Sequence, residues 1–285
     1  MGHRLRQTLK AGALILLSGT WIASASAQGD AKRGEYLAKA GGCLGCHTED
    51  KQDAVPYTGG RALRTPFGTF YGPNITPHPQ AGIGSWTEAD FMRAMRHGQR
   101  PDGANYFPAF PYPSFTSIAD SDLRDLWSYL RTLPASSRPS REHALGFFFR
   151  WRFLVTVWKW FFFTPVPFVS IHGASDIVNR GAYLVRALGH CGECHTPRNF
   201  LGAPKRGRFL AGHKDVPNLT PTGLKTWSDG ELKELFLTGV TPDDGPVSEA
   251  MDEVVRNTTS QLTPQDLAAL MAYLRSLPPL PNEPR

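Results

Sequence analysis

The pattern Cys-X-X-Cys-His occurs twice in this chain of 285 residues, as CLGCH at residues 43–47 and as CGECH at residues 191–195. Two thiols three positions apart can each form a thioether with one porphyrin, and the adjacent histidine can then bind the iron. All four cysteines of the chain lie in these two motifs. The sequence therefore predicts two covalently bound haem c groups, attached through Cys43, Cys46, Cys191 and Cys194, with His47 and His195 as iron ligands.

Two other kinds of site also use Cys-X-X-Cys. A structural zinc site would need further Cys or His ligands at matching positions. A thioredoxin-like redox dithiol has no need of the histidine that follows. Because a histidine follows both pairs of cysteines, the pattern favours haem attachment over these alternatives.

The first 27 residues have the pattern of a secretory signal peptide. A basic stretch at residues 3–10 precedes an apolar run at residues 11–22, and Ala25-Ser26-Ala27 forms a small-residue cleavage site before Gln28. The apolar run is shorter than a membrane-spanning helix normally requires. We therefore expect export to the periplasm, an oxidising compartment in which haem c can be attached.

Charge gives no indication of nucleic-acid binding. Residues 1–27 contain three of the 31 Lys and Arg residues and no acid, so the remaining chain has 28 basic and 25 acidic residues and a net charge of +3. There is no basic stripe with interleaved aromatic residues. Phosphate-binding glycine loops, Ser/His/Asp arrangements and paired-carboxylate motifs are not evident either.

The two halves of the chain repeat one another around the Cys-X-X-Cys-His motifs. The matching segments occur in the same order, which indicates a duplication that produced two homologous haem domains. The pairs are RGEYL (33–37) with RGAYL (180–184), PNITP (73–77) with PNLTP (217–221), Trp86 with Trp227, Gly98 with Gly239, and YLRTLP (129–134) with YLRSLP (273–278).

Helix signals recur in each copy. We expect first helices that begin near Asp30 and Asp176 and end in the motifs, and middle helices opened by capping boxes at residues 85–88 and 228–231. Thr263 followed by proline predicts the start of the last helix. One apolar face of that helix contains Leu267, Leu270, Met271, Leu274 and Leu277.

These signals predict an all-α fold of two haem domains. We expect the first domain at residues 28–138, an interdomain linker at residues 139–173 and the second domain at residues 174–285. Three helices around a haem, joined by loops rich in Gly and Pro, are expected in each.

A methionine sulfur is a common second axial ligand of haem iron, and it raises the reduction potential. Met251 lies between the middle and last helices of the second half, where we expect a loop and no packing role. Met271 belongs to an apolar helix face instead. We predict Met251 as the distal ligand of the second haem.

The distal ligand of the first haem stays open. In the repeat, the residue of the first half equivalent to Met251 is Phe110 or Phe107, and neither ring can bind iron. Of the remaining candidates, His78 and His97 are expected to be ordinary loop or helix-end histidines. We therefore expect the two haems to differ in potential or spin state. By the same repeat, Met95 is expected in the core and Met92 at the surface.

Residues 145–163 form a very aromatic segment. Arg150, Arg152 and Lys159 interrupt it, so a membrane span is not expected. It is either a linker packed across both domains or an exposed apolar patch that docks a partner or the membrane interface.

Five stretches of the chain are distinctive: GPNITP (72–77), SWTEADF (85–91), YFPAFPY (106–112), the aromatic segment and CHTPRN (194–199). In these stretches the chain resembles the cytochrome c subunits of periplasmic and membrane-associated dehydrogenases that oxidise alcohols, aldehydes, sugar acids and heterocycles. The resemblance covers nearly all residues after the signal peptide, and it implies tandem class I cytochrome c-like domains joined by an aromatic-rich linker. Met251 matches the distal methionine of that family, whereas some members have a methionine in the loop where this chain has Phe110.

Three hypotheses for function follow. The first is a non-catalytic electron-transfer protein, or a subunit of an oxidoreductase complex, that accepts electrons from a dehydrogenase subunit and passes them to a small cytochrome or terminal oxidase. The second is a dihaem enzyme, of the peroxidase or thiosulfate dehydrogenase type, with an open distal site on the first haem near Glu88, His78 or His97. The third is an anchoring subunit that recruits a dehydrogenase through the aromatic segment, with possible peripheral membrane association.

Overall fold

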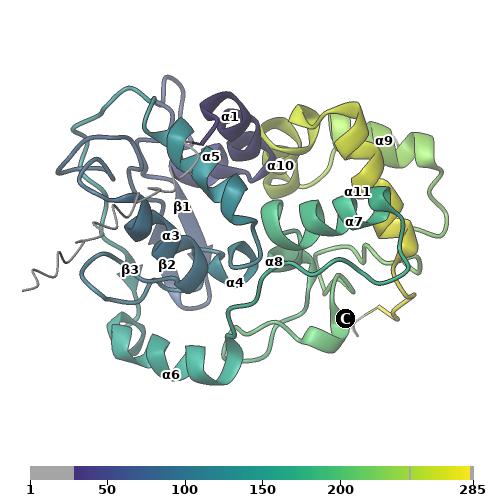
Figure 1. The fold of residues 1–285 in the computed structure, drawn as a ribbon. Coiled ribbons are helices and arrows are strands. Elements are labelled where there is room, and N and C mark those ends of the chain that lie inside the picture. Colours follow the sequence, from purple (N-terminus) through teal and green to yellow (C-terminus); the bar gives the residue numbers. More distant parts are fainter. Residues whose placement is uncertain (1–28, 244, 283–285) are drawn as a thin grey trace, which may run out of the picture.

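The computed structural model describes residues 29–243 and 245–282, and the predicted signal peptide lies outside them. The chain is mainly helical, and its two halves lie side by side with helix α6 along one edge (Figure 1). A three-stranded antiparallel sheet is also present. The prediction of an all-α fold with a simple aromatic linker was therefore wrong.

Each half is built around a pair of helices that cross closely. In the first half α1 packs against α5, and in the second half α7 packs against α11. The first half contains α1 (Ala31–Ala40), α2 (Cys43–His47), α3 (Glu88–His97), α4 (Tyr112–Phe115) and α5 (Asp120–Leu130). The second half contains α7 (Asp176–Tyr183), its continuation η2 (Leu184–Leu188), α8 (Gly192–His195), η3 (Arg206–Arg208), α9 (Asp229–Thr238), α10 (Glu249–Asn257), η4 (Thr259–Gln261) and α11 (Pro264–Ser276).

The glycine of each RG-X-YL repeat is explained by this crossing. A Cβ atom on Gly34 would lie 1.9 Å from the carbonyl oxygen of Asp125, and one on Gly181 would lie 1.9 Å from that of Ala269. Real Cβ atoms do not approach an oxygen so closely, so each crossing requires glycine. The repeated motif therefore marks the point of closest approach of two helices.

Most of the expected helix starts are found. Asp30 caps α1, Ser228 forms a capping box with Glu231, and the side chain of Thr263 accepts a hydrogen bond from the backbone of Asp266 at the start of α11. The box at residues 85–88 was placed wrongly, because Thr87 is the cap of α3 and pairs with Asp90. The first helices also end before the Cys-X-X-Cys-His motifs, which form separate short helices α2 and α8.

The sheet follows the first motif and also recruits the predicted linker. Strands β1 (Ala62–Thr65) and β2 (Gly68–Tyr71) form a hairpin, and β3 (Ala144–Leu145) pairs with β2 so that Leu145 lies opposite Gly68. Strand β2 contains Thr, Phe and Tyr, which suit a pleated, half-buried surface. Gly68 has φ of +123°, a conformation that only glycine adopts readily at this turn.

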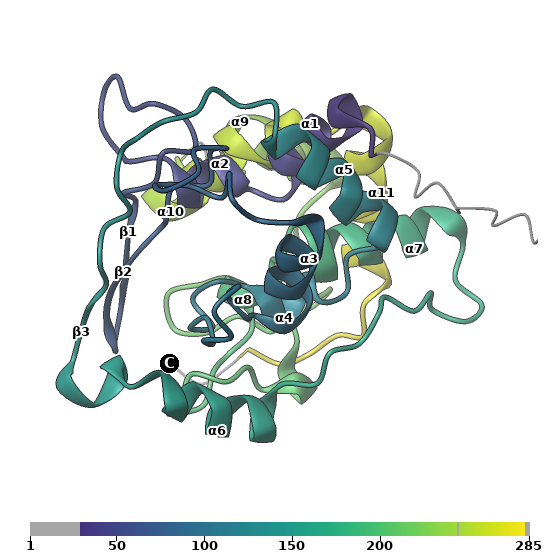
Figure 2. The same ribbon diagram turned by 60° about the vertical axis from the view of Figure 1, so that its left-hand side comes forward.

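The remainder of the predicted linker is structured. A 3₁₀ turn, η1 (Phe147–Arg150), leads into α6 (Arg152–Phe162), which runs along the outer edge of the molecule (Figure 2). Lys159 of α6 donates a hydrogen bond to the Asn105 side chain of the first half (2.7 Å), and Trp158 donates one to the Leu201 carbonyl of the second half (3.0 Å). Helix α6 therefore contacts both halves.

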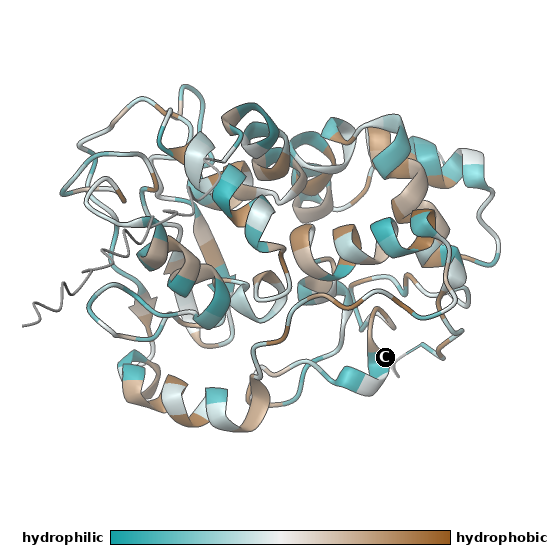
Figure 3. Cartoon of the chain, viewed as in Figure 1, coloured by the Kyte–Doolittle hydropathy of each residue, from teal (hydrophilic) through white to brown (hydrophobic). Residues whose placement is uncertain are grey.

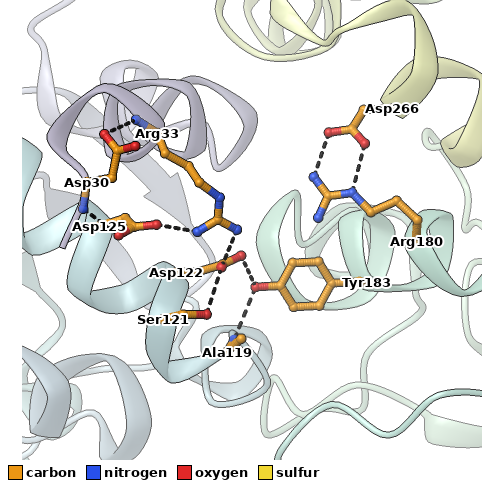
Figure 4. A network of polar contacts seen from close by, with 9 residues as sticks. All are labelled: Asp30, Arg33, Ala119, Ser121, Asp122, Asp125, Arg180, Tyr183 and Asp266. Atoms are coloured by element: carbon orange, nitrogen blue, oxygen red, sulfur yellow. Dashed lines mark hydrogen bonds and ion pairs between the residues drawn. The ribbon is translucent and has the colours of Figure 1, made fainter. Parts of the chain in front are cut away.

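The halves meet through reciprocal contacts between equivalent residues. The hydroxyl of Tyr183 donates to Asp122 of the first half (2.7 Å), and that of Tyr36 donates to Asp266 of the second half (2.5 Å). Each aspartate also binds an arginine of its own half: Arg33 approaches Asp122 to 2.6 Å, and Arg180 binds Asp266 at 2.6 and 2.8 Å (Figure 4).

The same two tyrosines also complete helix N-termini. Tyr183 accepts a hydrogen bond from the backbone N–H of Ala119 at the start of α5, and Tyr36 accepts one from that of Thr263 at the start of α11. First-turn N–H groups have no partner within their own helix. Each half therefore satisfies polar groups of the other, as in an interface with two-fold symmetry.

We expect Tyr183→Phe to lower the free energy of unfolding by about 1–3 kcal/mol, because buried Asp122 loses a hydrogen bond. Tyr36→Phe should have a similar effect through Asp266. The control is Tyr112→Phe, since the buried Tyr112 hydroxyl has no hydrogen-bond partner in the described part of the chain. Chemical denaturation of the haem-loaded proteins measures these changes, and an equal loss in all three variants would contradict the role of the interface.

Candidate functional site

The two motif histidines are held in the same way. Nδ1 of His47 donates a hydrogen bond to the Pro73 carbonyl at 2.8 Å, and Nδ1 of His195 donates to the Pro217 carbonyl, also at 2.8 Å. A carbonyl oxygen can only accept, so Nδ1 carries the proton and Nε2 keeps its lone pair. This is the tautomer and orientation that an iron ligand requires.

Partial burial also favours the neutral form of these rings. It is the largest influence on both groups, and it lowers the pKa of His47 and of His195 below the usual value, whereas the proline carbonyls act in the opposite, smaller direction. A neutral imidazole can donate a lone pair to a metal, and an imidazolium cannot.

The two Pro-Asn-(Ile/Leu)-Thr-Pro segments clamp the ends of their domains. Asn74 donates to the carbonyls of Ser136 (2.9 Å) and Arg138 (2.8 Å), and its side-chain oxygen accepts from the backbone and hydroxyl of Thr76. Asn218 repeats this arrangement with the Leu280 carbonyl and with Thr220. The sequence showed these segments only as repeats, but they hold the carbonyls that orient the histidines.

The cysteines have the properties of neutral thiols; Cys43, Cys46 and Cys191 are partly buried, and Cys194 is exposed. All four are free, and loss of solvation raises the pKa of Cys43 and of Cys191 to about 12 and that of Cys46 to about 11. Redox dithiols have lowered pKa values instead. Within residues 29–243 and 245–282, no three His, Cys, Asp or Glu side chains are grouped to bind a metal ion, so the structure gives no support to the zinc alternative.

The turns before the two motifs pack against each other. Gly42 (φ +64°) and His190 (φ +42°) are equivalent residues in the left-handed region. A Cβ atom on Gly42 would lie 3.8 Å from the His190 ring, and one on Gly41 would lie 3.3 Å from the Leu188 side chain. His190 also contacts the ring of Phe115, with centroids 5.2 Å apart. The two Cys-X-X-Cys-His motifs are therefore close neighbours across the interface of the halves.

Each half also contributes a contact to the motif of the other half. Ser114 of α4 donates a hydrogen bond to Glu193 within the second motif (2.8 Å). Glu253 of α10 forms an ion pair with Arg61, and a Cβ atom on Gly45 of the first motif would lie 3.1 Å from its carboxylate. The relative position of the two motifs is thus fixed by side chains from both halves.

Met251 lies in a different element from the one expected. It belongs to the first turn of α10, whereas the sequence predicted a loop. On this helix Glu253 and Asn257 face the first motif, and Met251 and Val255 share the opposite side, where both contact the hydrophobic core. This position is compatible with a role in the second half, and ligation by Met251 stays a prediction.

The candidates for the first distal ligand are not brought together by the structure. Nδ1 of His78 accepts a hydrogen bond from the backbone of Ala81 (3.1 Å), and His97 is exposed at the end of α3. Phe110 packs among Tyr106, Tyr112 and Phe115. As expected, Met95 is buried, but the expectation of a surface position for Met92 was wrong, because its side chain is partly buried against the core.

These residues fit haem c. Free, unpaired thiols stand three positions apart, and in both motifs the neighbouring histidine has its Nε2 lone pair available. Cys43 and Cys46 with His47 would hold one group, and the equivalent residues of the second motif would hold the other.

Comparisons with known proteins agree with this chemistry. The family model for cytochrome c matches residues 31–134 and 178–278. A diheme cytochrome c-type protein of Cereibacter sphaeroides is 41% identical over 296 residues, which cover 96% of this chain and 99% of the relative. The fructose dehydrogenase cytochrome subunit of Gluconobacter japonicus is 40% identical over 86% of this chain, and the alcohol dehydrogenase (quinone) cytochrome c subunit of Komagataeibacter europaeus is 36% identical over 99%. The matched region spans only 52% and 63% of these two longer relatives.

We expect Asn74→Ala to cost about 2–4 kcal/mol of stability, because several buried hydrogen bonds are lost together. Loss of this clamp frees the Pro73 carbonyl and should shift the midpoint potential of the first haem alone. The matched variant, Asn218→Ala, should shift only the second. Spectroscopic redox titration of both variants measures this, and equal shifts of both haems in either variant would rule out the assignment.

Replacement of Met251 by Ala should lower the potential of one haem, on the order of 0.1 V, since axial ligation as a whole spans about 0.8 V. Electron paramagnetic resonance should show a change of spin state at the same haem. Met271→Ala is the control, because Met271 contacts the core from the last helix. An unchanged spectrum in Met251→Ala would exclude this ligand.

Proposed function

The chain belongs to the cytochrome c family, and we propose that it is a periplasmic protein with two covalently attached haem c groups that carries electrons from a dehydrogenase to a downstream cytochrome or oxidase. The single observation that best supports this is the pair of equivalent His–Pro contacts at two neighbouring Cys-X-X-Cys-His motifs. Haem c, when bound, supplies a reversible one-electron couple. The domain limits 28–138 and 174–285 and the signal peptide at 1–27 are part of the proposal.

The residues of the chain act by holding and positioning. The cysteines tether, and His47 and His195 present Nε2, while the proline carbonyls fix the ring orientation. The Tyr–Asp contacts and the Ser114–Glu193 hydrogen bond keep the two attachment segments adjacent. No general acid or base is required for this task.

A dehydrogenase donor is supported by the names of several relatives, which are cytochrome subunits of fructose, alcohol and gluconate dehydrogenases. The proposed acceptor, a small cytochrome or terminal oxidase, is chosen because both accept electrons one at a time, as haem c supplies them. The encounter with this acceptor is expected to be small and transient, and its rate to depend on ionic strength. The alternative function is a dihaem redox enzyme with an open site on the first haem. The experiment described next also tests this alternative.

An affinity-tagged chain purified from periplasm and membranes should retain a dehydrogenase that reduces both haems when its substrate is added. We expect the rate of electron transfer from the haems to an added small cytochrome to fall about tenfold between low and high salt, as for charge-steered encounters. The variant Cys191→Ala/Cys194→Ala is the control and should show one haem less by intact mass. Peroxide turnover by the isolated protein, or carbon monoxide binding at its reduced first haem, would instead favour the enzyme alternative.

A further inference from the structure

Helix α6 has the reverse of the usual amphipathic arrangement. Its polar residues face the protein: Arg152 donates to the Asn105 carbonyl (2.7 Å), Thr156 accepts from the Asn105 side-chain amide (2.8 Å), and Lys159 donates to the Asn105 side-chain oxygen (2.7 Å). Val155, on the same face, is the buried residue of the helix. A surface helix normally turns its apolar stripe inward.

The apolar stripe of α6 therefore faces outward. The stripe consists of five large apolar residues, with those on successive turns three or four positions apart along one face of the helix. The exposed fractions are 62% for Phe153, 39% for Leu154, 47% for Val157, 83% for Trp160 and 69% for Phe161. Figure 3 shows apolar residues recurring along this outer helix.

The 3₁₀ turn before the helix extends the same surface. Phe147, Phe148 and Phe149 are 61%, 65% and 46% exposed, and Trp151 is 45% exposed. Folded chains rarely leave so many large apolar side chains in water without a partner. We call this surface, from Phe147 to Phe161, the α6 ridge.

Positive charge flanks the α6 ridge at both ends. Arg150 is exposed at its start, and Arg206, also exposed, donates a hydrogen bond to the Phe162 carbonyl at its end (3.1 Å). Residues 143–175 contain no Asp or Glu. A surface with aromatic residues at the centre and cations at the rim is complementary to anionic headgroups above acyl chains.

We propose that the α6 ridge inserts into the interface of a bilayer that contains anionic lipids, with α6 parallel to the membrane plane. Helix α6 lies on the outer edge of the molecule in both views, which suits contact with a planar surface (Figures 1 and 2). Trp rings lie at headgroup level, and Phe and Leu form the apolar face of helices that lie in the membrane interface. None of the described helices has the length and apolarity that a membrane span requires.

This inference deepens the proposed function, because it places the haem domains at the membrane surface. Its test is independent of electron transfer. The probe is a vesicle made of equal parts phosphatidylcholine and phosphatidylglycerol, and sedimentation of the haem-loaded protein with vesicles gives the partition coefficient without any donor.

The wild-type protein should bind these vesicles. The variant F153S/W160S/F161S should bind at least about tenfold more weakly, since the apolar area that enters the bilayer is lost. The matched control V55S/I177S/L237S replaces exposed apolar residues outside the ridge (58%, 48% and 39% exposed) and should bind like the wild type. Arg150→Gln with Arg206→Gln should weaken binding to these vesicles and leave binding to pure phosphatidylcholine unchanged.

Unchanged far-ultraviolet circular dichroism and unchanged haem absorption show that each variant is folded. The proposal is overturned if the wild type does not sediment with vesicles, or if the ridge variant and the control bind equally. It is also overturned if the ridge variant keeps vesicle binding but loses a co-purifying dehydrogenase, because the ridge would then be a protein interface. A protein that binds vesicles but receives no electrons from a dehydrogenase would contradict only the proposed function.

Discussion

The hydrogen bond from each motif histidine to a proline carbonyl is the contact on which the two sites depend. It selects the tautomer of His47 and of His195, and it connects each motif to a loop far along the sequence. The loop is in turn held by Asn74 or Asn218, which bind carbonyls beyond the last helix of the same half. Ring orientation is therefore determined by the complete fold of a domain, since the first and last segments of each half must both be in place.

The stability of each half also depends on side chains of the other half at their interface. Asp122 and Asp266 are buried acids, and each needs its own arginine together with a tyrosine from the opposite half. Burying an ionised carboxylate is costly unless hydrogen bonds replace its water. The two halves thus stabilise one another at the ends of α5 and α11, close to the segments that precede the motifs.

Much of the helical framework could be predicted because its signals are local. Asp30, Ser228 and Thr263 mark helix starts through side-chain hydrogen bonds to residues two or three positions away. The motif residues could be identified from their spacing, which is typical of attachment to one porphyrin, and their role as haem ligands stays a prediction. Structural features that depend on neighbours distant in sequence were missed. Strand β3 forms only because β2 lies beside it, and α10 exists although Met251 was expected in a loop.

The aromatic segment illustrates the same limit. Its composition could not distinguish a packed linker from an exposed patch, because that depends on which face of α6 finds partners. Asn105 forms hydrogen bonds with the polar face of α6, and the aromatic face is exposed to solvent. Sequence periodicity predicts that a helix has two faces, but only tertiary contacts decide which face is buried.

Tyr36 and Tyr183 each bind an aspartate of the opposite half. Two separate copies of such a domain could make the same contacts as a symmetric dimer, and that dimer would dissociate on dilution. Joining the copies in one polypeptide replaces a bimolecular equilibrium by an intramolecular one, with a high effective concentration set by the connecting segment. The pairing of the two attachment sites is consequently the same at every protein concentration.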